Sequence, residues 1–143
     1  MDNMKPTNAF KLSALASLII GMGAYLIGLF NANMQLNEKG YYLIILLYSL
    51  FAAVSLQKVV RDKQEALPIS KPYSVTCWLS LSIAIALLTI GLYNADMLLS
   101  EKGFFAMAYT LSLFSAITVQ KNIRDMLLFK KNETDLPTQD IIE

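Results

Sequence analysis

The sequence predicts an all-α integral membrane protein with four transmembrane helices, arranged as two tandem helical hairpins. Its 143 residues are 55% hydrophobic, with a mean hydropathy of +0.47 and only 16% charged residues, against about 25% in ordinary soluble domains. Four stretches of 26, 18, 24 and 18 residues contain no charged side chain. Residues 28–62 also align with residues 91–125 without a gap, and 17 of the 35 pairs are identical, which indicates an internal duplication.

Each uncharged stretch is long enough to cross a bilayer. A hydrocarbon core about 30 Å thick requires about 20 helical residues, so we predict spans at about 12–33, 38–58, 74–96 and 101–121. The first stretch exceeds the apolar part of a signal peptide and lacks a convincing cleavage site, so we interpret it as a retained span. A soluble bundle is disfavoured because nearly every helix face would be apolar, with too little polar surface to cover them.

Each copy of the repeat corresponds to one helical hairpin, at residues 12–66 and 74–128. A hairpin enters and leaves on the same side, so the two copies should form a parallel repeat with a shared orientation. Ten of the twelve Lys and Arg residues lie near the termini and the middle connection, and only Lys39 and Lys102 lie in the turns. The positive-inside rule therefore predicts cytoplasmic termini and outward-facing turns. We expect the polar residues 130–143 to form a disordered cytoplasmic tail.

The two turns share a polar decapeptide, "NANMQLNEKG" at 31–40 and "NADMLLSEKG" at 94–103. In a structural interpretation, the two Asn residues end one helix, Asn37 and Ser100 are N-caps of the next, the Glu residues oppose the helix dipole, and the glycines remove bulk where the hairpin reverses. The alternative is an outward binding patch. The residues concerned are Asn31, Glu38, Lys39, Gly40, Asn94, Asp96, Glu101, Lys102 and Gly103. We favour capping, although Asp96 in place of Asn33 breaks the symmetry.

Small residues follow one face of the second and fourth predicted helices. Because lipid gives helices no hydrophobic reason to associate, small side chains and hydrogen bonds must supply the contacts. We expect these stripes to bring helices together in a compact bundle, and we hypothesise that they also form homo-oligomers. They comprise Ser49, Ala53 and Gln57 in the first copy and Ser112, Ala116 and Gln120 in the second.

A second repeated motif, "QKVVRD" at 57–62 and "QKNIRD" at 120–125, lies where these helices leave the bilayer. Lysine and aspartate at i and i+4 pair on a helix surface, and Lys or Arg side chains anchor a helix at the interface. We interpret the motif as an inner-leaflet anchor, with binding of anionic lipid head groups as the alternative. Its charged residues are Lys58, Arg61, Asp62, Lys121, Arg124 and Asp125.

Composition argues against several functional classes. There is no histidine, and Cys77 is the only cysteine, so a metal site built on these residues is not expected, and no cofactor is predicted. A net charge of +1 gives no reason to expect nucleic acid. The predicted spans lack a nucleophile with a recognisable base, which argues against an enzyme. They also lack the ionisable residue that a transporter usually keeps within the bilayer.

The paired segments "GL[FY]NA[ND]M.L.EKG[YF][YF]" and "SLF.A...QK..RD" resemble the YiaA/YiaB inner-membrane proteins of bacteria, whose unit is the YiaA/B two-helix domain. The resemblance covers about residues 12–126 and is closest to members with two copies. It implies a bacterial inner (cytoplasmic) membrane location and a duplicated hairpin, and it supplies no activity. We therefore expect a non-catalytic membrane protein that contacts lipid and acts by self-association or by lateral contact with other membrane proteins. A small oligomeric channel or transporter is the alternative.

Overall fold

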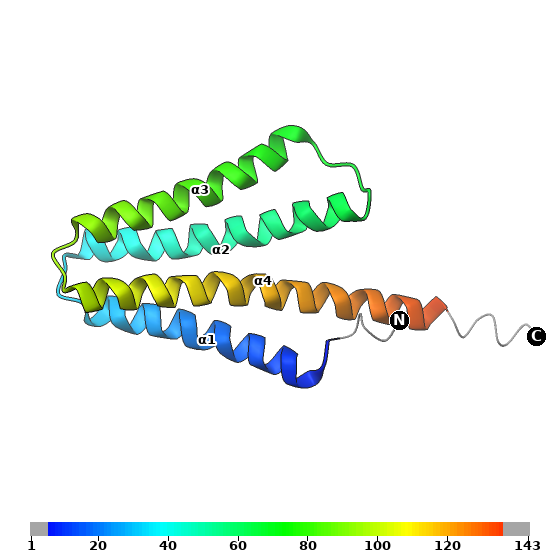
Figure 1. The fold of residues 1–143 in the computed structure, drawn as a ribbon, viewed down its shortest axis with the longest axis horizontal. Helices are drawn as coiled ribbons and strands as arrows, with labels where there is room; N and C mark the ends of the chain where they lie inside the picture. The colour runs from blue at the N-terminus through cyan, green and yellow to red at the C-terminus, as the bar shows by residue number, and fades with distance from the viewer. Residues whose placement is uncertain (1–5, 136–143) are drawn as a thin grey trace, which may run out of the picture.

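The computed structural model describes residues 6–135, which contain four long helices (Figure 1). They are α1 (Asn8–Asn31), α2 (Leu36–Gln64), α3 (Lys71–Asn94) and α4 (Leu99–Asp135). Within this described part, all four are long and apolar enough to cross a membrane. The predicted all-helical fold with four membrane-length helices is therefore confirmed.

Two helices continue well beyond their predicted spans. α2 runs to Gln64 and α4 to Asp135, because the charged residues that follow each apolar stretch are good helix formers and are joined by ion pairs. The expectation of disorder from Lys130 is wrong for residues 130–135, which remain in α4. The rest of that predicted tail, 136–143, lies outside the described residues.

The helices do not pack as two separate hairpins. The most extensive contacts join α1 to α4 and α2 to α3, α2 and α4 also touch, and the consecutive helices α1 and α2 touch only slightly. Figure 1 shows the resulting order, α3, α2, α4 and α1, across the molecule. The first helix of each copy therefore packs on the second helix of the other copy, so each hairpin takes its main partners from the other repeat.

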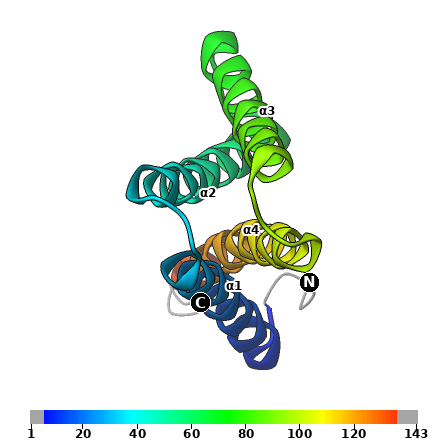
Figure 2. The ribbon, with the colours of Figure 1, turned by 90° about the vertical axis from the view of Figure 1, so that its left-hand side faces the viewer.

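The two ends of the molecule differ in how tightly the helices approach. Both turns, residues 32–35 and 95–98, lie at one end, which we call the turn end. There the four helices come together around a shared core, whereas α1 and α3 diverge from α4 and α2 toward the opposite end (Figures 1 and 2). We call this second end the charged end, because Asp62 and Asp125 lie there. The expectation of a compact bundle is thus correct only for the turn end.

Reciprocal glycine contacts relate the two copies by approximate two-fold symmetry. A Cβ built on Gly28 of α1 would lie 2.6 Å from Cε1 of Phe104 in α4, and one on Gly91 of α3 would lie 2.8 Å from Cε1 of Tyr41 in α2. Gly91 and Phe104 are 63 residues after Gly28 and Tyr41, which is the period of the repeat. Glycine at these positions lets an aromatic ring of the other copy pack against the helix backbone.

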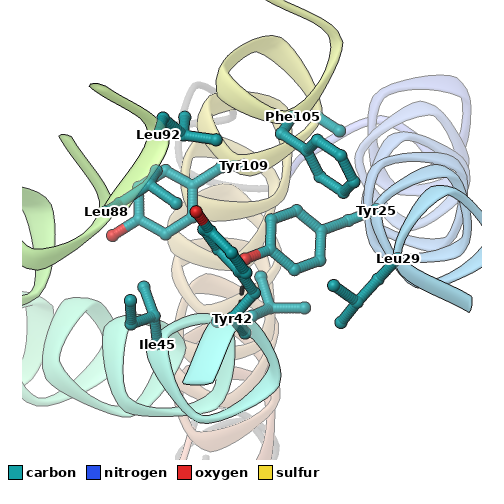
Figure 3. Close-up of a cluster of buried hydrophobic side chains, with 10 residues drawn as sticks. Tyr25, Leu29, Tyr42, Ile45, Leu88, Leu92, Phe105 and Tyr109 are labelled. Carbon is teal, nitrogen blue, oxygen red and sulfur yellow. Dashed lines mark hydrogen bonds between the residues drawn. The ribbon is translucent and has the colours of Figure 1, made fainter. Parts of the chain in front are cut away.

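The core lies toward the turn end and draws side chains from all four helices (Figure 3). Tyr25 of α1 is fully buried, and its hydroxyl donates a hydrogen bond to the backbone carbonyl of Tyr42, 2.8 Å away. Its ring meets that of Phe105 edge-on, with centroids 5.5 Å apart. Tyr109 of α4 donates to the hydroxyl of Ser49 in α2. These buried polar contacts join three helices, and within a membrane they matter because lipid provides no hydrophobic driving force for helix association.

Candidate functional site

The asparagine and lysine side chains of the two decapeptides cap the C-termini of α1 and α3. The Asn31 and Asn94 side chains each donate to the carbonyl oxygen four residues earlier, at 3.0 Å. The Lys39 ammonium donates to the Phe30 carbonyl at 3.0 Å, and the Lys102 ammonium donates to the Tyr93 carbonyl at 3.3 Å. A cation at the C-terminus of a helix also opposes the negative end of its dipole. Each of these four side chains therefore has a capping contact.

The second helix of each hairpin begins earlier than predicted, so its N-cap is not the predicted residue. α2 begins at Leu36 and α4 at Leu99, so Asn37 and Ser100 lie inside the first turn and are not N-caps. Glu38 accepts a hydrogen bond from the backbone N–H of Gln35 at 3.2 Å, and Glu101 accepts one from that of Leu98 at 3.4 Å. This is the reciprocal half of a capping box.

The role expected for the turn glycines is wrong. A Cβ built on Gly40 or Gly103 would meet nothing within 4 Å, so neither glycine makes room for the chain reversal. The reversal occurs earlier, in residues 32–35 and 95–98, where the bounding residues Ala32 and Ala95 are extended. The glycines that packing explains are instead Gly21 and Gly28 in α1 and Gly91 in α3.

Two pockets lie at the turn end, each between the end of one copy's first helix and the start of the other copy's second helix. The larger, about 490 Å³, lies between α3 and α2 and includes Glu38, Tyr41 and Asp96. Its symmetry counterpart, about 300 Å³, lies between α1 and α4 and includes Glu101 and Phe104. The phenylalanine and the absence of an Asp96 equivalent make the smaller pocket less polar. No group of three or more potential metal ligands occurs among residues 6–135.

The two small-residue stripes lie inside the molecule. Ser49 and Ser112 are fully buried, and Ala53 and Ala116 are buried as well. The hypothesis that these stripes form the interface between two protein molecules is therefore wrong, because helices of the other repeat in the same chain already cover them. Gln57 and Gln120 are half-buried, and neither side chain makes a hydrogen bond to another helix within the described part of the chain.

At the charged end the two QK..RD motifs bind each other. The predicted i, i+4 pairs are present, Lys58 to Asp62 at 3.3 Å and Lys121 to Asp125 at 3.1 Å. Two further pairs cross between the copies. Arg61 of α2 lies 2.8 Å from Asp125 of α4, and Arg124 of α4 lies 3.5 Å from Asp62 and 3.5 Å from Glu65 of α2. Each motif thus supplies the arginine for the other's aspartate.

These crossing pairs are largely withdrawn from solvent. The Arg61 and Asp125 side chains are only 14% and 13% exposed, so their attraction is screened less than that of surface ions. Burial alone would raise the pKa of the Asp125 carboxyl, but the hydrogen bonds and charges of Arg61 and Lys121 outweigh it and hold that pKa below its ordinary value. Asp125 lies beyond the uncharged stretch of α4. In the sequence, this network is indicated by the QK..RD motif, which occurs at the same place in two parallel hairpins.

Four membrane-length helices built from a duplicated hairpin, joined by buried tyrosines and by one cluster of ion pairs, define a small polytopic membrane protein. The chain belongs to the YiaA/B two-helix domain family, since the family model for the yiaA/B two helix domain matches residues 10–62 and 73–125. The two matched segments coincide with the two structural repeats.

Relatives agree with this assignment. The chain is 48% identical to the inner membrane protein YiaA of Escherichia coli (strain K12), over the full length of both proteins. It is 42% identical over 60 residues to the uncharacterized membrane protein YubF of Bacillus subtilis (strain 168), which covers 41% of this chain and 69% of the relative. No solved structure matches the chain. The four apolar helices and the full-length relative support a multi-pass inner-membrane location.

Proposed function

We propose that this chain is a non-catalytic inner-membrane protein that acts by lateral contact in the bilayer, chiefly by association with further copies of itself. The absence of histidine and the charge-free spans leave little from which a catalytic centre could be built. The outer helices α1 and α3 each pack extensively on one neighbour only. Most of their surface is therefore available to other membrane components.

The observation that carries the proposal is Gly23 on α1. Gly21, Gly28 and Gly91 are each explained by a close neighbour within the chain, but a Cβ built on Gly23 would meet nothing within 4 Å. A glycine inside a helix costs about 1 kcal/mol relative to alanine, and no contact within residues 6–135 offsets that cost. Small residues allow close approach of helices in membranes, so we assign Gly23 to a contact with a helix of another copy.

The test compares assembly size in lipid nanodiscs and in mild detergent. Gly23→Leu places a bulky side chain at the proposed contact and should shift the protein toward the monomer in light scattering and in cross-linking. Ile90→Phe, on the other outer helix α3 at a residue that is 57% exposed, is the control because it lies away from Gly23, and it should leave assembly unchanged. A monomeric parent protein, or equal assembly of both variants and the parent, would refute self-association at this face.

We further propose that the charged end faces the cytoplasm. The support is the distribution of basic residues, since the turns contain only Lys39 and Lys102. In a Cys77→Ala background, single cysteines at positions 38 and 70 should react differently with an impermeant thiol reagent added from outside the cell. We expect labelling at 38 and protection at 70. The reverse pattern would invert the orientation.

A second candidate function, a channel or transporter, is favoured by the larger turn-end pocket. That pocket combines Glu38, Asp96 and the Tyr41 region in about 490 Å³. Below it, however, the core is filled by Tyr25 and Leu46, both fully buried. Release of ions and small solutes from liposomes decides between the candidates. If lateral contact is the function, vesicles that contain the protein should release each solute no faster than protein-free vesicles.

A further inference from the structure

A groove runs between α1 and α4 at the charged end, where the two helices diverge. Its volume is about 360 Å³, and Leu15 of α1 with Ile123 and Leu127 of α4 give it an apolar wall. Lys11 and Lys130 also line it. Asn122, Met126 and Lys130 recur at i, i+4 and i+8, so they share one face of α4. One part of the groove is thus apolar and the other carries two cations. This order matches a membrane, in which acyl chains are followed by head groups.

The two cations at this groove lack carboxylate partners within residues 6–135. The Lys11 ammonium donates to the Met126 sulfur at 3.7 Å, and a thioether is a weak acceptor for a full positive charge. Lys130 is exposed and takes part in none of the ion pairs. The basic residues of the QK..RD motifs, by contrast, are each paired with a carboxylate. Head-group binding by those motif residues, the alternative drawn from the sequence, would have to break ion pairs, whereas Lys11 and Lys130 are available.

Asn122 supplies the second, independent observation. Its side chain is only 4% exposed, and neither its amide nitrogen nor its amide oxygen has a hydrogen-bond partner. It lines the groove one turn before Met126. A buried amide with both atoms unpartnered within the chain is rare in folded proteins and calls for a partner from outside it, a ligand or an ordered water.

The other copy provides an internal comparison. The equivalent groove, between α3 and α2, has a volume of about 230 Å³. Val59, Ser74 and Trp78 occupy the positions of Asn122, Lys11 and Leu15. Val59 is 2% exposed and packs in an apolar cluster, so this position does not require a polar residue for folding. The equivalent groove is lined by one lysine, Lys63, at the position of Met126, whereas Lys11 and Lys130 both line the groove between α1 and α4. The buried amide and the pair of cations therefore distinguish the groove between α1 and α4.

We propose that this groove binds one phospholipid with a net negative head group. The phosphodiester oxygens accept hydrogen bonds from Lys11 and Lys130, a glycerol ester carbonyl accepts from the Asn122 amide, and an acyl chain lies against Leu15 and its apolar neighbours. Two uncompensated cations select an anionic head group over a zwitterionic one, whose ammonium they would repel. This inference goes beyond the proposed self-association and needs only the membrane location.

The experiment is native mass spectrometry of the full chain released from detergent, titrated with phosphatidylglycerol, phosphatidylethanolamine or inorganic phosphate. We expect one phosphatidylglycerol per chain, held more tightly than phosphatidylethanolamine. The double variant Lys11→Gln with Lys130→Gln should weaken phosphatidylglycerol binding by at least about tenfold, given the attraction of each basic residue to anionic lipid. Lys71→Gln is the matched control, because it removes an exposed lysine at the same end of the molecule outside the groove, and it should bind as the parent does.

Two further variants borrow the residues of the other copy, so their folding has a precedent within the chain. Asn122→Val removes the amide, and Leu15→Trp fills the groove without altering charge; each should weaken lipid binding while the circular dichroism of the protein is unchanged. Equal retention of the two lipids, binding of inorganic phosphate without lipid, or undiminished binding by the Leu15→Trp variant would overturn the proposal. Oligomer size, read in the same spectra, tests self-association separately.

Discussion

Gly21 and Gly23 lie two residues apart on α1 and have opposite surroundings. A Cβ on Gly21 would lie 2.8 Å from the Ser112 hydroxyl oxygen and 3.0 Å from its backbone nitrogen, whereas one on Gly23 would meet nothing within 4 Å. Backbone cannot yield as a flexible side chain does, so α1 and α4 would have to separate. We therefore predict that Gly21→Ala lowers the free energy of unfolding by about 1–3 kcal/mol.

Gly23→Ala is the matched control for that prediction. Alanine has the higher helix propensity, so this variant should change the unfolding free energy by between zero and about 1 kcal/mol in the stabilising direction. Unfolding in mixed micelles with increasing denaturing detergent, followed by circular dichroism, measures both. The assigned packing of α1 on α4 would be untenable if the two alanine variants behaved alike.

The hydroxyl of Tyr109 gives a second prediction at the scale of single residues. It donates to Ser49, which is fully buried and itself donates to the Ile45 carbonyl. Tyr109→Phe removes one hydrogen bond between α4 and α2 and keeps the ring, so we expect a loss of about 0.6–1.7 kcal/mol of stability, as measured for such bonds in membranes. Tyr48→Phe, at a residue that is 37% exposed, should have no effect in the same unfolding assay.

Single residues also show what the sequence could and could not predict. Residue type near a helix end places Asn31, Asn94, Glu38 and Glu101 where the structure has them. It did not specify their contacts: each Asn amide donates to the carbonyl four residues earlier, and each Glu accepts from a backbone N–H. The start of α2 was misplaced because Asn37 is a common N-cap residue, although a residue earlier in the turn serves instead. The sequence did not predict that Asn122 is a buried site residue, because a single amide within a charged QK..RD motif is expected to be exposed.

At the scale of elements, the crossing ion pairs join α2 to α4. A double-mutant cycle on Arg61→Ala and Asp125→Ala should give a coupling energy above that of the Lys58–Asp62 pair, for which an exposed i, i+4 contact predicts about 0.3–0.5 kcal/mol. The reason is burial: Arg61 and Asp125 are 14% and 13% exposed, whereas Lys58 is 57% exposed. Both cycles use the same unfolding assay, and equal coupling in the two would show that the crossing pair is merely a surface contact.

The same network predicts a loss of stability in acid. The pKa of Asp125 is lowered in the folded protein, so its stabilising contribution is fully present above the carboxyl's ordinary pKa and disappears as the pH falls through the folded pKa. The melting temperature should therefore decline in that acidic window, and Asp125→Asn should have a lower melting temperature near neutral pH and a shallower acid decline. A parallel decline in both proteins would mean that other carboxyl groups govern acid unfolding.

Element boundaries illustrate the limits of reasoning from hydropathy. The uncharged stretches located all four helices, because a bilayer requires long apolar runs. The i, i+4 pairs of the QK..RD motifs predict one or two further helical turns beyond each apolar stretch, and α2 has them, ending at Gln64. Neither signal predicted that α4 would continue as far as Asp135. Nor could they predict that the Ser49 and Ser112 stripes are buried within the chain; a small-residue stripe indicates close approach of helices without naming the partner.

At the scale of the whole molecule, the duplication explains why partner exchange is possible. Each hairpin has two helices that barely touch each other, and each of these helices packs on a helix of the other copy. A chain with one such hairpin would have to pair with a second copy to cover the same surfaces. The sequence showed the repeat and its parallel orientation. Hydropathy is the same whether helices pair within each hairpin or between the two hairpins, so it could not predict the pairing. The structure shows the pairing through the contacts of Gly28, Gly91, Arg61 and Arg124.

Exchange of partners makes a direct prediction about the two halves. Residues 1–66 and 67–143, produced as separate chains, should each be unstable alone, because α1 lacks α4 and α3 lacks α2. Coexpressed, they should copurify and recover the thermal stability of the intact chain apart from the cost of losing the connection. Arg61→Asp in the first half should weaken copurification, and Asp125→Arg in the second half should partly restore it, since the crossing pair is then reversed. Stable, monomeric halves that ignore each other would contradict the exchanged packing and favour independent hairpins.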